Sequence, residues 1–122
     1  MLHIINVAGR QRMLTQKMTK EKLLIAKGQA EYNEKLHETI KLFDDSLQVL
    51  MNGDLNQTIA KPTNEDIKAQ LIKVSDIWDK LKPIYQKENP TTEELAMIIE
   101  KNPVLLAEMH KMVAMAKQVT DY

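Results

Sequence analysis

The spacing of apolar residues constrains the fold of this chain most. Apolar side chains recur every three or four residues, as in the stripe formed by Leu36, Ile40, Phe43, Leu47 and Leu50. This is the period of an amphipathic α-helix, whereas a half-buried strand would alternate every second residue. Only three glycines and four prolines interrupt the 122 residues. The sequence therefore predicts an all-α fold.

Glycines predict where the first two helices end. The first helix is expected over residues 3–27 and should end at Gly28, because glycine readily adopts the left-handed conformation that closes helices. The second helix is expected over residues 30–51 and should end at Asn52-Gly53. Residues 54–62 then have the composition of a loop.

Prolines and capping residues in the second half of the chain predict where its helices begin and end. Thr63 is expected to cap the third helix, and Pro83 should kink or fray its end because proline lacks a backbone N–H. Thr91-Thr92-Glu93-Glu94 predicts a capping box for a short extra helix, and Asn102-Pro103 predicts that the last helix begins at Pro103. Together the segments predict one domain over residues 1–122. It would be an up-down four-helix bundle with a short extra helix before the last one, and both termini would lie at the same end.

Charge and composition exclude several classes of function. Lys plus Arg and Asp plus Glu each number 17, so no overall field would attract the chain to nucleic acid. There is no cysteine, and His3, His37 and His110 lack ligand-type spacing, so neither a disulfide framework nor a metal site is expected. No nucleophile, base and orienting group stand at mutually sensible positions. The chain is therefore expected to be neither an enzyme nor the carrier of a cofactor.

The first helix places an arginine on a face without acidic neighbours. At roughly 100° per residue, uncharged residues surround Arg12: Gly9 and Gln16 on one side, and Ala8, Thr15 and Thr19 on the other. The apolar or small arc of this helix exceeds half its circumference, which is too wide for a helix that buries one face against its own bundle. Small residues also let another backbone approach closely. We infer a homodimer face on this helix.

An arginine in the middle of such a face needs a negative partner. An unpaired guanidinium there carries a desolvation cost of several kcal/mol. A carboxylate from another helix would offset this cost, and so would a bound anion. In a two-fold contact each Arg12 meets its own copy, and one planar oxyanion between the two guanidinium groups would relieve their repulsion. Arg10 lies about 160° away and is expected to be solvated or close to a membrane.

The residues around Arg12 resemble a known family. Residues 6–18, Asn-Val-Ala-Gly-Arg-Gln-Arg-Met-Leu-Thr-Gln-Lys-Met, are similar to the N-terminal motif of PilJ-type (type IV pili methyl-accepting chemotaxis) sensor domains. A shorter version of the motif resembles the periplasmic motif of nitrate and nitrite sensor kinases. In the family an arginine at the position of Arg12 binds nitrate at a two-fold dimer interface. Val7 stands where the kinases often carry lysine, so the choice between nitrate and nitrite does not carry over.

Together, the helical arrangement and the resemblance imply a ligand-binding domain of a bacterial transmembrane chemoreceptor or sensor. It would be a periplasmic homodimer that binds nitrate, or a similar small oxyanion, through Arg12, Gly9, Ala8 and Gln16. Flanking transmembrane helices would carry the signal. The alternative is a constitutive helical dimerisation or protein-interaction module, in which a carboxylate satisfies Arg12. An amphipathic module lying on a membrane surface is a third class.

Overall fold

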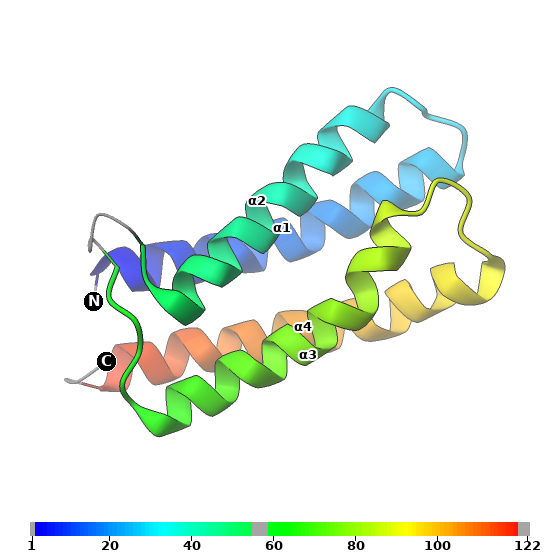
Figure 1. The fold of residues 1–122 in the computed structure, drawn as a ribbon. Coiled ribbons are helices and arrows are strands. Elements are labelled where there is room, and N and C mark those ends of the chain that lie inside the picture. Colours follow the sequence, from blue (N-terminus) through cyan, green and yellow to red (C-terminus); the bar gives the residue numbers. More distant parts are fainter. Residues whose placement is uncertain (1, 55–58, 120–122) are drawn as a thin grey trace.

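The computed structural model describes residues 2–54 and 59–119, and within them the chain forms four helices. They are α1 (Leu2–Ala26), α2 (Tyr32–Asn52), α3 (Glu65–Gln86) and α4 (Thr92–Gln118). Figure 1 shows them running alternately in opposite directions, with α1 beginning and α4 ending at the same end of the bundle. We call this end proximal and the opposite end distal. The prediction of an all-α up-down bundle is confirmed.

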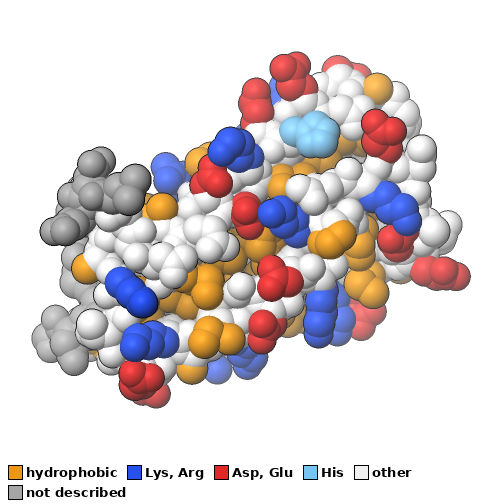
Figure 2. Space-filling view, in the orientation of Figure 1, with side chains coloured by type: hydrophobic (Ala, Val, Ile, Leu, Met, Phe, Trp, Pro, Cys, Tyr) orange, Lys and Arg blue, Asp and Glu red, His pale blue; other side chains and the backbone are white. Residues whose placement is uncertain are grey.

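The arrangement of neighbours gives α1 two packing partners. α1 packs against both α2 and α4, and α3 completes the bundle by packing against the same two helices. Figure 2 shows hydrophobic side chains along the seam between α2 and α3, with charged side chains on both sides of it. None of the described helices combines the length and the apolar character that crossing a bilayer requires.

The ends of α2 and α3 follow from local chemistry. Gly53 closes α2 at φ +76°, and a Cβ at this position would lie 2.9 Å from the Ile59 carbonyl oxygen, so only glycine fits without rearrangement. Asn64 caps α3, because its side-chain oxygen accepts hydrogen bonds from the backbone N–H groups of Asp66 and Ile67. The predicted cap at Thr63 is therefore one residue too early. Pro83 lies inside α3, which bends toward its C-terminal end in Figure 1.

The predicted break before the last helix is wrong. The capping box of Thr91 and Glu94 is present, but the helix that it opens continues through Pro103 to Gln118. Asn102 does not cap a helix. It is buried, and its Nδ2 donates to the Thr15 carbonyl oxygen at 2.9 Å and to the Tyr85 hydroxyl at 2.8 Å. Proline disfavours a helix interior, but the contacts that Asn102 makes across the core hold α4 in place next to Pro103.

Aromatic residues form the centre of the core. The Phe43 and Trp78 rings lie 4.5 Å apart between centroids, and the Trp78 and Tyr85 rings lie 6.1 Å apart. Trp78 Nε1 donates to Asp44 at 2.9 Å, and Lys82 Nζ donates to the other carboxylate oxygen at 3.1 Å. Burial opposes ionisation of Asp44, but the hydrogen bonds from Trp78 and Lys82 outweigh it and lower the pKa of this carboxyl. The indole N–H is thus satisfied at the edge of the core.

Candidate anion-binding site

Arg12 lies on α1 at the boundary between the buried and the exposed part of the helix. Side chains in an α-helix lean toward its N-terminus, and Arg12 accordingly extends back beside Gly9. A Cβ at position 9 would lie 3.5 Å from Nη2 of Arg12, so the absence of a side chain at Gly9 leaves this part of the guanidinium uncovered. On the other side, Nη1 lies 3.1 Å from Nδ1 of His110 on α4.

The partner of Arg12 within the chain is neutral. An arginine only donates hydrogen bonds, so Nδ1 of His110 accepts one and the imidazole carries its proton on Nε2. Among the described residues, no carboxylate lies within ion-pair distance of Arg12. Arg12 is half-buried, and no carboxylate among the described residues compensates its charge there. Such a group favours the approach of an anion with planar oxygens.

An exposed strip of α1 lies next to Arg12. Gln16 is exposed and Gly9 is partly exposed, and both belong to the arc that the helical period places beside Arg12. Met13 lies in the same arc and is 56% exposed, which is unusual for so large an apolar side chain. Arg10 is exposed on the other side of the helix, as predicted. The structure therefore brings Arg12, Gly9 and Gln16 together at one surface.

The sequence predicts that small residues of α1 let a second copy approach, but the structure gives Ala8 and Thr15 a different role. Ala8 and Thr15 have no exposed surface and belong to the interior of the single chain. Thr15 Oγ1 donates to the Gln11 carbonyl oxygen at 2.7 Å, and the Thr19 hydroxyl lies 2.8 Å from the Tyr85 hydroxyl. Because α1 packs against both α2 and α4, its wide apolar arc is buried within the bundle. The width of the arc and these small residues therefore do not require a second copy.

The sequence does not predict the positions of His110 and Lys22. His110 has the spacing of an ordinary helix residue, and only the antiparallel packing of α1 and α4 brings it to Arg12. Lys22 is one of several basic residues in the sequence of α1, yet it is only 4% exposed. The sequence gives no sign of this burial, because a lysine is seldom buried unless it has partners.

The fold and the arginine surface define a class of protein. The fold is a helical bundle whose first and last helices share one end, and the arginine surface lies on the first of these helices. The chain belongs to the family described as the type IV pili methyl-accepting chemotaxis transducer N-terminal domain, whose model matches residues 2–97. The resemblance found in residues 6–18 is thereby confirmed.

Two further similarities agree with this family. The chain is 30% identical over 119 residues to the methyl-accepting chemotaxis protein McpN of Pseudomonas aeruginosa, a match that covers 96% of the chain. The chain spans 22% of the length of that relative. It is also similar to the solved ligand-binding domain of the P. aeruginosa nitrate receptor McpN, with a TM-score of 0.82 and 28% identity over 93% of this chain and 92% of that one. The chain is therefore a chemoreceptor sensor domain in sequence and in fold.

Proposed function

We propose that the chain is the extracytoplasmic, periplasmic ligand-binding domain of a transmembrane chemoreceptor, and that it binds nitrate between two copies of itself. The observation that carries the proposal is the half-buried guanidinium of Arg12, whose partner in the chain is the neutral imidazole of His110. A carboxylate partner would compete with an incoming anion, whereas an imidazole acceptor orients the guanidinium and leaves its charge available. The similarity to a nitrate receptor identifies nitrate as the first anion to test.

The proposed site lies on the exposed strip of α1. Arg12 of each copy donates to one nitrate on the two-fold axis, Gln16 offers a further amide, and Gly9 lets the two helices approach. Met13 would be covered in the same contact. Ala8 is fully buried on the other flank of Arg12, so its part in the proposed site is to pack α1 against the bundle.

The proximal end is the proposed connection to the membrane. α1 begins and α4 ends there, so both helices can continue into flanking transmembrane helices. Arg12 and His110 join these same two helices. A nitrate that draws Arg12 toward the two-fold axis acts directly on the contact between α1 and α4, and the signal originates there when the two states differ in nitrate affinity.

Calorimetry combined with sedimentation tests this proposal. The purified domain should bind nitrate at one ion per two chains, and nitrate should move it from monomer toward dimer at constant ionic strength. Nitrite, sulfate, phosphate and short carboxylates complete the panel. Binding of one nitrate per monomer would contradict the shared site. A stable dimer that binds no anion would instead favour the alternative, a constitutive interaction module.

A further inference from the structure

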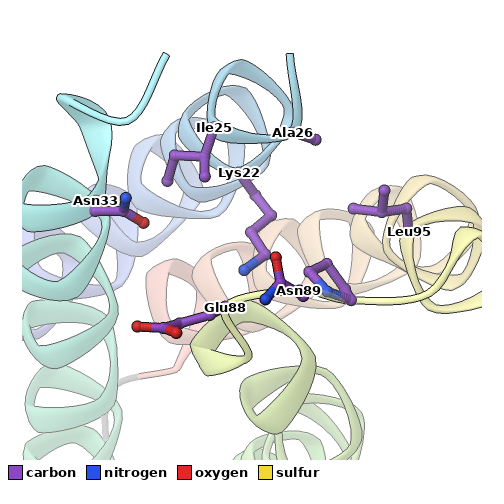
Figure 3. Close-up of a pocket in the computed structure, with 8 residues that line it drawn as sticks. Lys22, Ile25, Ala26, Asn33, Glu88, Asn89 and Leu95 are labelled. Atoms are coloured by element: carbon purple, nitrogen blue, oxygen red, sulfur yellow. The ribbon is translucent and has the colours of Figure 1, made fainter. Parts of the chain in front are cut away.

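A cavity lies at the distal end of the bundle, away from the Arg12 surface. Its volume is about 450 Å³, within the range of small-molecule sites. It lies among the last turn of α1, the first turn of α2 and the segment that joins α3 to α4 (Figure 3), and it is lined by Lys22, Ile25, Ala26, Asn33, Glu88, Asn89, Pro90 and Leu95. At roughly 1.5 Å per residue, Lys22 lies about 15 Å along α1 from Arg12.

Lys22 is a buried cation in the wall of this cavity. It is 4% exposed, and its Nζ donates to the Tyr85 carbonyl oxygen at 3.0 Å and to the Lys87 carbonyl oxygen. An ammonium group has three donors, so one donor remains beyond these two bonds. Burial lowers the pKa of Lys22, and the charge of Glu94 acts in the opposite direction. Among the described residues, no carboxylate lies within ion-pair distance of its Nζ.

The other lining residues supply polar and apolar surfaces. In Figure 3 the Lys22 ammonium and the Asn89 side chain converge on the cavity, and Asn33 reaches toward it from α2. The Glu88 carboxylate lies on the far side of the cavity from Leu95. Ile25 and Leu95 are partly buried and provide an apolar wall. The cavity thus combines one buried positive charge, amide groups, one acidic group and a short aliphatic surface.

We propose that this distal cavity is a second ligand site, which takes a small aliphatic carboxylate, best a small α-amino acid. The ligand carboxylate accepts from the free donor of Lys22 and from the Asn89 amide. An α-ammonium group, where the ligand has one, faces Glu88, and a short side chain packs on Ile25 and Leu95. The site does not depend on nitrate or on dimerisation, because all its residues come from one chain.

Titration of the wild-type domain tests the proposal directly. The probes are acetate, propionate, glycine, alanine and serine, measured by calorimetry at constant ionic strength. Saturable binding of at least one carboxylate is expected, and the amino acids should bind more tightly than the carboxylates without an ammonium group. If none of these probes binds at millimolar concentration, the proposal is overturned.

Two variants locate the binding without disturbing the Lys22 hydrogen bonds. Ala26→Trp places a large ring in the cavity mouth from an exposed position and should abolish binding. Asn89→Leu removes one donor and should weaken binding by about tenfold. Carboxylate binding that is unchanged in Ala26→Trp would overturn the proposed site. Lys22→Met should also abolish binding, and its folding is checked by circular dichroism, because it removes a helix-capping contact as well.

Two further variants test the role of Glu88 and the separation of this site from the Arg12 surface. Glu88→Gln should weaken the binding of amino acids and leave the affinity for acetate unchanged. Equal effects on both affinities would overturn the role given to Glu88. Arg12→Lys should leave carboxylate binding intact, which separates this site from the proposed nitrate site. A loss of carboxylate binding in Arg12→Lys would mean that the anions share the Arg12 surface and would overturn a second site.

Discussion

Arg12 and Lys22 lie on the same helix, and neither has a carboxylate within ion-pair distance among the described residues. Their surroundings differ. Arg12 is half-buried at a surface and contacts one neutral imidazole, whereas Lys22 is buried and donates to the backbone at the end of α3. The first cation is available to a ligand at little cost to the fold. The second holds two helices together, and only its remaining donor can serve a ligand.

The largest expected effect concerns nitrate binding at Arg12. Arg12→Lys keeps the charge but removes the planar pair of donors, so nitrate should bind at least about thirtyfold more weakly, or about 2 kcal/mol. Arg10→Lys is the matched control on the exposed side of α1, and its affinity should stay within about twofold of the wild type. Calorimetry measures both. Similar losses in the two variants would show that general charge, and not the Arg12 surface, attracts the ion.

The second prediction compares the two cations in stability. Lys22→Met leaves the carbonyl groups of Tyr85 and Lys87 without their donor, so the free energy of unfolding should fall by about 1–3 kcal/mol. Arg12→Met should change it by no more than about 0.5 kcal/mol, because Arg12 lies at the surface. Urea unfolding measures both values. The contrast between the two regions fails if Arg12→Met is as destabilising as Lys22→Met.

A smaller effect is expected at His110. His110→Leu removes the acceptor that orients Arg12, so nitrate affinity should fall by about three- to tenfold, or about 1 kcal/mol, with no loss of folding stability. His37→Leu, at an exposed histidine of α2, is the control. Isotope-edited NMR should also find the His110 proton on Nε2. Unchanged affinity in His110→Leu would remove the imidazole from the site.

The smallest expected effect is a dependence of stability on alkaline pH. Burial lowers the pKa of Lys22 in the folded chain below its usual 10.5. The unfolded chain therefore binds this proton more tightly, and the free energy of unfolding should rise with pH from the lowered value up to about 10.5. Urea unfolding of wild type and Lys22→Met across alkaline pH should show the rise only in the wild type, and parallel profiles would contradict it.

Local sequence determined much of the fold. Apolar spacing predicts the four helices, and the two end-forming glycines predict the ends of α1 and α2 within one or two residues, because both signals act through neighbouring residues of one helix. At Asn102-Pro103, local sequence does not decide the structure. The pair has the local chemistry of a helix start, but Asn102 finds better partners in Thr15 and Tyr85, which are distant in sequence. The helix consequently runs through Pro103.

In the candidate sites, too, some features follow from local sequence and others from tertiary packing. The residue pattern by itself determined that Arg12 lies on a face of α1 without acidic neighbours, since only the helical period is needed to place residues on one helix. Tertiary structure alone decided that Ala8 is buried within the chain, that His110 meets Arg12, and that Lys22 enters the distal cavity. The physical reason is that burial and contact between helices depend on how the helices pack, and the period of one helix does not specify which neighbour covers each face.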